Sequence, residues 1–138
     1  MNASTTLLKR IDTKVLLSTL WIVVMINMLK ADILSLYIPG SMEETLKTAA
    51  EAGTSVSMLM LFGAFMMELS ILMIILSRVL NYRLNRKANI LISAITIVFV
   101  IAGGVSYPHY IFIASVEVIC LLLILWSAWN WRDVEAEK

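Results

Sequence analysis

The chain has 138 residues, of which 60% are hydrophobic, and its formal net charge at pH 7 is +1. Soluble domains contain roughly 45–50% apolar residues, so this composition argues against a soluble domain and predicts an integral membrane protein. The small net charge gives no support to a nucleic-acid-binding function.

Four apolar runs of the sequence are long enough to cross a bilayer core of about 30 Å. They cover about residues 15–37, 56–76, 88–105 and 110–131. The connections between the second, third and fourth runs are short, so successive helices should pack antiparallel. We therefore predict an all-α fold, an antiparallel four-helix bundle that forms a single membrane domain over residues 1–138.

The first run follows Lys9, Arg10 and Lys14. It is longer than the roughly 7–15 apolar residues of a signal-peptide core, so we interpret it as a retained helix. Toward its end it carries two charged residues, Lys30 and Asp32. These residues lie about 200° apart around a helix and therefore cannot pair with each other.

Counting from Pro39 after the first run and from His109 before the fourth places Lys30 and Glu117 at similar depths. We therefore predict an ion pair between them, with snorkelling of Lys30 to the outer interface as the alternative. Asn27 shares a helix face with Lys30. Asp32 lies nearer the boundary, where it is predicted to pair with His109 at the mouth of a cavity or to be a solvated interfacial residue.

Between the first two runs, residues 41–52 are predicted to form a short helix on the outer surface of the membrane. Ser41 followed by Glu44 fits a capping box, and Gly53 can end the helix. The apolar residues between them share one face, as expected for an interfacial helix.

The second and fourth runs are similar over residues 68–83 and 117–132. Glu68 aligns with Glu117, and an Asn-aromatic-Arg sequence ends both segments. At about 1.5 Å per residue each glutamate lies about 22 Å from the aligned arginine, near the membrane midplane. A charged acid there costs at least about 2.5–3.5 kcal/mol, so we predict that both carboxylates turn inward and meet in one poorly hydrated pocket. The alternative is a structural role, with each glutamate protonated or hydrogen-bonded to a neighbouring helix.

The third run carries a stripe of small and polar residues at helical spacing. Its members are Asn89, Ser93, Thr96, Val100 and Gly104. Such stripes usually mark close helix packing in membranes, which we predict here, with a ligand-binding wall as the alternative.

Cys120 is the only cysteine and His109 the only histidine of the chain. A dithiol redox centre, a bis-histidine haem and a multi-histidine metal site are therefore excluded within one chain. We predict no metal, no cofactor and no catalytic residue. An enzyme acting on a lipid or quinone is the least favoured class, because no nucleophile and base stand at a recognisable spacing.

The cations of the chain gather on one side of the predicted layout. Nine of the eleven Lys and Arg residues lie there, namely Lys9, Arg10, Lys14, Arg78, Arg83, Arg86, Lys87, Arg132 and Lys138. The positive-inside rule therefore predicts that both termini are cytoplasmic.

The segments "NMLKADILSLY", "FMMELSILMIILSRVLNYRLNRKANI" and "PHYIFIASVEVICLLLILWSAWNW" together resemble a family of small bacterial four-helix membrane proteins with a domain of unknown function. The similarity spans about residues 12–131. It implies a location in the bacterial inner membrane and a topology broadly similar to that of DoxX-like proteins. It implies no activity, because a shared fold does not define a function.

The leading hypothesis is a membrane bundle that binds or transports a proton, a cation or a small amphipathic ligand. Its expected site comprises Glu68 and Glu117, with Lys30, Asp32, Asn27 and His109 assisting. The chain is small for a transport pathway, so a homodimer is a possible requirement. The alternative hypothesis is a non-catalytic accessory or structural subunit that contacts a membrane-protein partner.

Overall fold

The computed structural model describes residues 12–103 and 107–132. Within these ranges the chain is helical and contains no strand. The helices are α2 (Thr13–Leu36), α3 (Ser41–Glu51), α4 (Val56–Val79), α5 (Tyr82–Ala102) and α6 (Pro108–Trp129). All of them except α3 are long and apolar enough to cross a membrane, judged by length and composition.

Local side-chain chemistry fixes where the long helices begin. The side chain of Asp12 accepts a hydrogen bond from the backbone N–H of Lys14 at the start of α2. Ser55 and Asn81 cap α4 and α5 in the same way. Pro108 occupies the first turn of α6, where its missing N–H leaves no hydrogen bond unmade.

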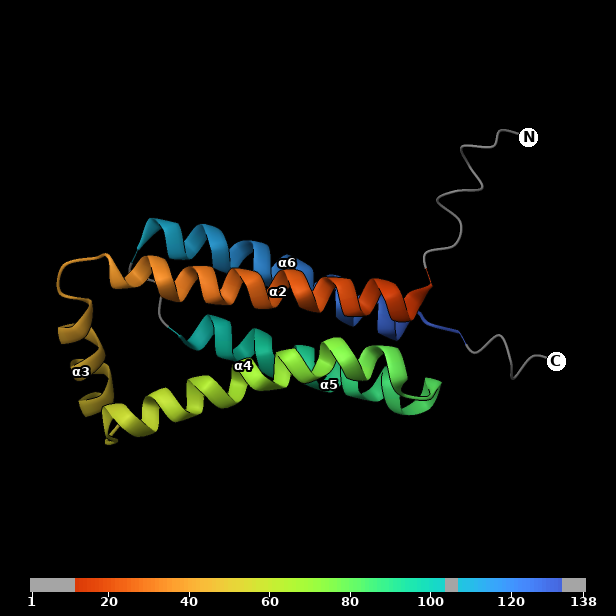
Figure 1. The fold of residues 1–138 in the computed structure, drawn as a ribbon, viewed down its shortest axis with the longest axis horizontal. Coiled ribbons are helices and arrows are strands. Elements are labelled where there is room, and N and C mark those ends of the chain that lie inside the picture. The colour runs from red at the N-terminus through yellow and green to blue at the C-terminus, as the bar shows by residue number, and fades with distance from the viewer. Residues whose placement is uncertain (1–11, 104–106, 133–138) are drawn as a thin grey trace.

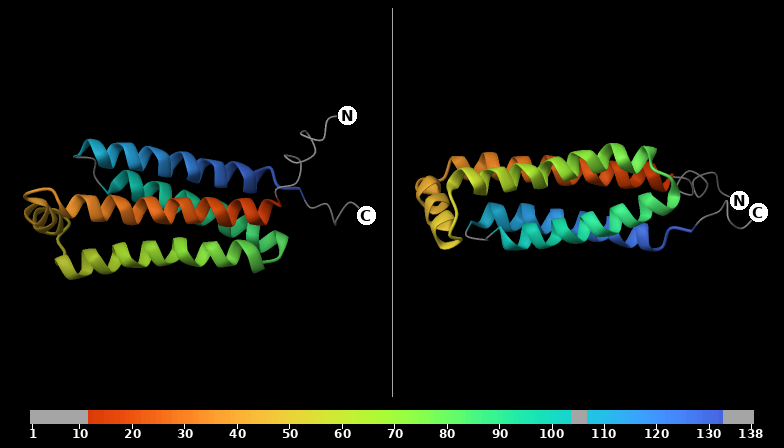
Figure 2. Two further views of the ribbon diagram at one scale, coloured as in Figure 1. Left: turned by 45° about the horizontal axis from the view of Figure 1, so that its top comes forward. Right: turned by 90° about the horizontal axis from the view of Figure 1, so that it is seen from below.

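The long helices lie side by side, and α3 crosses one end of them (Figure 1). Helices α2 and α4 form one layer and α5 and α6 form the other (Figure 2). Each of α2 and α5 contacts both α4 and α6, and the α4–α5 contact is the least extensive of these. We call the end that carries α3 the α3 end. The opposite end, where α2 begins and α6 finishes, is called the Arg86 end.

The core is formed mainly by α2 and α6, which contribute most of its fully buried apolar side chains. Leu17, Trp21 and Val24 of α2 and Leu121 and Ile124 of α6 have no exposed surface. Each set recurs every three or four residues, which places it on one face of its helix. The packing of these two faces therefore holds the helix that carries Glu117 against the helix that carries Lys30 and Asp32.

Helix α5 begins at Tyr82 and not at about residue 88, because Asn81 caps a polar first turn that hydropathy alone does not mark as helical. The predicted packing stripe on this helix is confirmed. Its buried residues are Asn85, Asn89, Ser93, Thr96 and Val100. Gly104, the last member of the predicted stripe, lies outside the described residues.

Helix α3 begins at the predicted residue, but the predicted capping box is wrong. Gly40 is the N-cap residue, with φ 88°, and no side chain caps the helix. Because glycine adopts positive φ at little cost, the chain turns sharply at Gly40, and Ser41 becomes the first helical residue.

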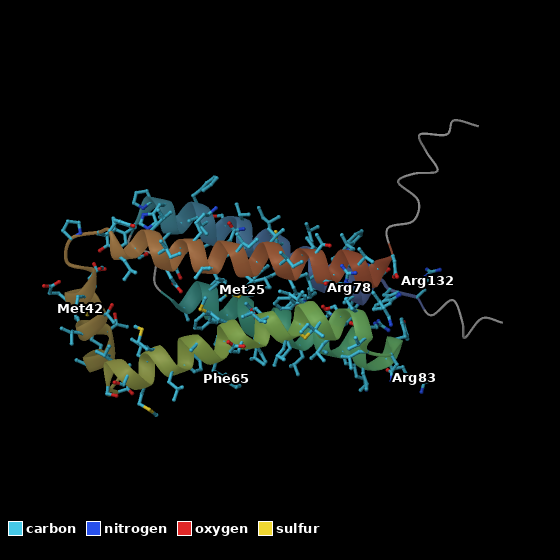
Figure 3. All side chains as sticks on the ribbon, viewed as in Figure 1. Met25, Met42, Phe65, Arg78, Arg83 and Arg132 are labelled. Atoms are coloured by element: carbon cyan, nitrogen blue, oxygen red, sulfur yellow. The ribbon has the colours of Figure 1, made fainter. Side chains whose placement is uncertain are left out.

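Most of the described cations lie at one end of the molecule, and several acids lie on α3 at the other. Arg78, Arg83 and Arg132 lie at the Arg86 end, and Met42 of α3 lies at the other (Figure 3). Lys14, Arg86 and Lys87 also belong to the Arg86 end, whereas α3 carries Glu43, Glu44 and Glu51 with Lys47 as its only cation. Lys9, Arg10 and Lys138 lie outside the described residues.

Candidate functional site

Glu117 is the one acidic side chain that is buried among the described residues. Only 4% of its surface is exposed. On α6 it lies between the buried residues Ile113 and Leu121, so it belongs to the inward face of that helix. Its Oε1 atom is buried and has no hydrogen-bond partner among the described residues. Buried carboxyl oxygens are normally hydrogen-bonded, so this atom needs a functional or structural explanation.

Glu117 lies near the middle of the molecule. At 1.5 Å per residue it is about 14 Å along the helix from Pro108 and about 18 Å from Trp129. It is therefore about two and a half turns into α6 from the α3 end.

Three polar residues of α2 surround the stretch that packs against this part of α6. Asn27 is buried, with 8% of its surface exposed, and Ala31 follows it on the same face. Lys30 and Asp32 flank Ala31 and are exposed. Both charged residues lie close enough to Glu117 to act on it electrostatically.

The predicted ion pair between Lys30 and Glu117 is wrong. Within the described part of the chain the only ion pair is the exposed one between Lys47 and Glu51. The reason is helix geometry: α2 presents Ala31 to the core, which turns Lys30 and Asp32 about 100° to either side. The exposed position of Lys30 agrees with the alternative, in which its side chain reaches toward an interface.

The prediction that Glu68 turns inward is also wrong. Glu68 is exposed, and the inward face of α4 is formed by Met66, Ser70, Met73 and Ser77. Glu68 is about 200° around the helix from Met66, so it points to the opposite side. Phe65, one turn away on the outward face, points away from the other long helices (Figure 3). Glu68 and Glu117 therefore do not share a pocket.

The pseudo-repeat that linked these two glutamates does not correspond to equivalent structures. Asn81 is the N-cap of α5, where its side chain accepts a hydrogen bond from Leu84 N. Its aligned residue, Asn130, is the C-cap of α6, and its Nδ2 donates to Trp126 O. Asn81 thus begins a new helix, whereas its aligned residue Asn130 ends one.

Tyr110 is a member of the site that sequence reasoning missed. It precedes Glu117 by about two turns on the same face of α6, and it is close enough to both Glu117 and Asp32 to sense their charge. Its hydroxyl lies beside Gly103, where an added Cβ would be only 2.8 Å from it. The sequence signal that could have revealed Tyr110 was its spacing from Glu117, which places both residues on one face of a helix. We refer to Glu117, Tyr110, Asn27, Lys30 and Asp32 as the Glu117 site.

His109 lies at the α3 end, next to this site. Its ring stacks on Tyr107 with a centroid distance of 5.8 Å, and its buried Nε2 has no hydrogen-bond partner among the described residues. The predicted pair with Asp32 is wrong, since no such ion pair occurs in the described ranges. The Tyr107 hydroxyl instead donates to Glu44 Oε2 at 2.7 Å, which ties the start of α6 to α3. This bond to a carboxylate raises the pKa of Tyr107.

A second buried polar cluster lies closer to the Arg86 end, and all its members are hydrogen-bonded. Trp21 Nε1 and Ser77 Oγ donate to Asn89 Oδ1 at 2.8 and 3.2 Å. Asn89 Nδ2 donates to Asn85 Oδ1 at 2.7 Å, and Asn85 Nδ2 donates to Ser77 O at 2.7 Å. We call these four residues the Asn89 network. It joins α2, α4 and α5 through the core.

The Glu117 site is not built like a metal centre. No group of three or more His, Cys, Asp or Glu side chains that could hold a metal ion occurs among the described residues. Cys120, one turn from Glu117, is buried and free. The donor groups of the site are the buried carboxyl of Glu117, the exposed carboxyl of Asp32, one amide and one phenol, which suit a proton or a weakly coordinated cation better than a transition metal.

The chain matches the family of unknown function DUF6326 over residues 9–137 and belongs to that family. No curated protein and no solved structure matches it. The family assignment supplies no activity, so the function is argued from the Glu117 site.

Proposed function

We propose that the chain is a multi-pass protein of the bacterial inner membrane, in which the four long helices form an antiparallel bundle. The lengths and apolarity of these helices support the insertion. The concentration of cations at the Arg86 end supports a cytoplasmic position for that end, and α3 then lies on the outer surface. In this orientation Glu117 lies in the outer half of the bilayer.

We further propose that Glu117 binds a proton when the site is empty and exchanges it for a cation or a small cationic amphipathic molecule. The single observation that carries this proposal is the buried, unpartnered Oε1 of Glu117. An ionised carboxylate in that position would lack the cation or the hydrogen bonds that compensate a buried charge. A protonated carboxyl is neutral and avoids this cost. A bound cation removes the cost by compensating the charge of the carboxylate.

The surroundings of Glu117 support access from the α3 end. Tyr110 lies about two turns closer to that end on the same face of α6, and Asp32 is exposed near the corresponding end of α2. Asp32 offers a first carboxylate to an approaching cation, and its charge acts on both Tyr110 and Glu117. Lys30 faces the other edge of α2, so its charge disfavours entry along that side.

The test is the binding of tetraphenylphosphonium, a lipophilic cation, to the purified full chain in detergent. Calorimetric titrations in buffers of different ionisation enthalpy give the number of protons released on binding. We expect the wild type and Glu68→Gln to release a proton for each cation bound, and Glu117→Gln to bind without proton release or not at all. Proton release that persists in Glu117→Gln would overturn the proposal.

A second candidate function, that of a non-catalytic subunit of a membrane assembly, is favoured by the exposure of Glu68. Glu68 lies on the outward face of α4 with the exposed side chains of Leu61, Phe65, Leu72 and Ile75. A carboxylate that faces lipid near the middle of a span is costly, so such groups are usually covered by protein. We propose that a helix of another membrane-protein subunit covers this face. A second copy of this chain counts as such a subunit.

Recovery of the assembly from native membranes tests the second candidate. If Glu68 is covered by a partner, Glu68→Leu should reduce recovery of that partner, or of a differently tagged second copy, and Glu68→Gln should reduce it less. The isolated chain should not lose stability in either variant. Full recovery with Glu68→Leu, together with increased stability of the isolated chain, would mean that Glu68 faces lipid and would reject this role.

A further inference from the structure

A basic pocket lies at the Arg86 end, on the first turns of α5 and far from the Glu117 site. It has a volume of about 260 Å³ and is lined by Tyr82, Arg83, Arg86, Lys87 and Ile90. Three of these side chains are cations, and none of them is in an ion pair with a residue of the described ranges. The lining of the pocket is therefore mostly apolar, and its three cationic side chains are not paired with an acid of the described ranges.

One wall of the pocket is held in place by the end of α6. Arg86 Nε donates to Ala128 O at 3.1 Å, and its Nη2 donates to Trp129 O at 2.9 Å. These carbonyls belong to the last turn of α6, where no intrahelical partner is available and a cation is favourable. Arg86 is thus a structural cap, and its position does not depend on a ligand.

The ring of Tyr82 is fixed by the segment that follows α6. Its hydroxyl donates to Trp131 O at 2.7 Å, and its ring packs edge to face on Trp131 with a centroid distance of 5.2 Å. Because the hydroxyl of Tyr82 is already hydrogen-bonded to Trp131 O, Tyr82 offers mainly its ring to the pocket. Ile90 extends the apolar surface about two turns further along α5.

Arg83 and Lys87 form no ion pair with any residue of the described ranges. Both are exposed, and they lie four positions apart on α5, which puts them on the same face of the helix. At the Arg86 end Asp12 is the only acid of the described residues, and its side chain caps α2. Two exposed cations beside an apolar wall match a molecule with an anionic head and an aliphatic body.

We propose that this basic pocket binds an anionic phospholipid, with its phosphate at Arg83 and Lys87 and its first acyl carbons on Tyr82 and Ile90. The location at the end of the membrane-crossing helices favours a lipid over free phosphate, which would not use the apolar wall. The proposal rests on the membrane insertion proposed above, but not on proton binding at Glu117, which has its own test.

Native mass spectrometry of the full chain in detergent with added phosphatidylglycerol or phosphatidylcholine tests the proposal. Each juxtamembrane cation contributes about 1 kcal/mol to the attraction of anionic lipid, which corresponds to about fivefold in affinity. We expect Arg83→Gln and Lys87→Gln each to weaken phosphatidylglycerol binding by about that factor. Phosphatidylcholine should bind weakly to all forms, and inorganic phosphate should not displace the lipid.

Arg78→Gln is the matched control, because Arg78 lies at the same end on α4 and does not line the pocket. It removes the same charge and should leave lipid binding nearly unchanged. Equal losses in Arg78→Gln and Arg83→Gln would mean that only general positive charge attracts the lipid, and would overturn the proposal. Displacement by inorganic phosphate, or equal binding of phosphatidylcholine, would overturn it as well. Circular dichroism checks that each variant keeps its helical content.

Discussion

The Asn89 network and the carboxyl group of Glu117 are both buried polar groups in a highly apolar protein, but they differ in how their hydrogen bonds are satisfied. In the Asn89 network every described donor and acceptor meets a partner on another residue of the cluster. At Glu117 a carboxyl oxygen is equally buried and meets none. The first cluster is complete in itself, whereas the buried carboxyl oxygen of Glu117 can still accept a hydrogen bond.

This difference separates a structural role from a binding role. A satisfied network ties helices together and specifies one packing of the core, and adding a ligand would break bonds that already exist. An unsatisfied buried group reduces stability, and that cost is acceptable where a function needs the group. Substitutions in the two clusters should therefore change stability in opposite directions.

The largest expected effect is the loss of stability in Asn89→Leu. This change leaves Trp21 Nε1 and Asn85 Oδ1 buried without partners. Each unsatisfied buried polar group costs about 1–3 kcal/mol, so we expect a decrease in the free energy of unfolding of about 2–4 kcal/mol. Denaturant titration in mixed micelles measures it. Asn130→Leu is the control, because the exposed Asn130 amide bonds only to its own helix, and it should lose less than about 1 kcal/mol.

The opposite sign is expected for Glu117→Leu. Removal of a buried carboxyl that lacks a partner should raise the free energy of unfolding by about 1–3 kcal/mol in the same assay. Glu117→Gln keeps the size of the side chain and should change stability less. If Glu117→Leu destabilises the protein as much as Asn89→Leu does, the carboxyl has a structural partner and the contrast between the two clusters fails.

A smaller effect is expected at the contact between Gly103 and Tyr110. Gly103→Ala places a Cβ 2.8 Å from the Tyr110 hydroxyl, so one of the two must shift. Overpacking of this kind costs about 1–2 kcal/mol. Tyr110→Phe removes the obstructing oxygen, so the double variant should recover most of the loss. A double variant whose loss equals that of Gly103→Ala would show that the alanine clashes with the backbone and not with Tyr110.

The smallest effect concerns the exposed hydrogen bond between Tyr107 and Glu44. The bond to the carboxylate raises the pKa of Tyr107 above its usual value near 10. Its stabilising contribution is therefore present below pH 10 and is lost as the pH rises through the raised pKa. An ultraviolet titration should show that Glu44→Gln lowers the pKa of Tyr107, with Tyr107→Phe identifying its signal. An unchanged titration would mean that the bond does not form in solution.

The sequence predicted the helices well because each long run is bounded by residues with a clear role. Ser55 and Pro108 begin helices close to the predicted bounds, and the runs that follow them have the length and apolarity of membrane-spanning helices. The first turns of α5 were missed because they are polar. The predicted stripe on α5 was correct because polar residues are rare enough there to mark the packed face.

The inward direction of Glu68 could not be inferred in the same way. Helix α4 is apolar around its whole circumference, so hydropathy does not distinguish its faces, and the alignment with Glu117 decided the prediction. The better signal was the recurrence of Met66, Ser70, Met73 and Ser77 every three or four residues, which marks the packed face. For Lys30 and Asp32, counting residues along the helix gave no direction around α2, which is set by the packing of Ala31.

The protonation of Glu117 in the resting protein is the claim on which the functional account depends. Infrared spectroscopy detects it directly, because a protonated carboxyl has a C=O stretch that a carboxylate lacks. At neutral pH we predict this band in the wild type and in Glu68→Gln, and its loss in Glu117→Gln. A wild-type spectrum without the band, or a band that persists in Glu117→Gln, would contradict the account.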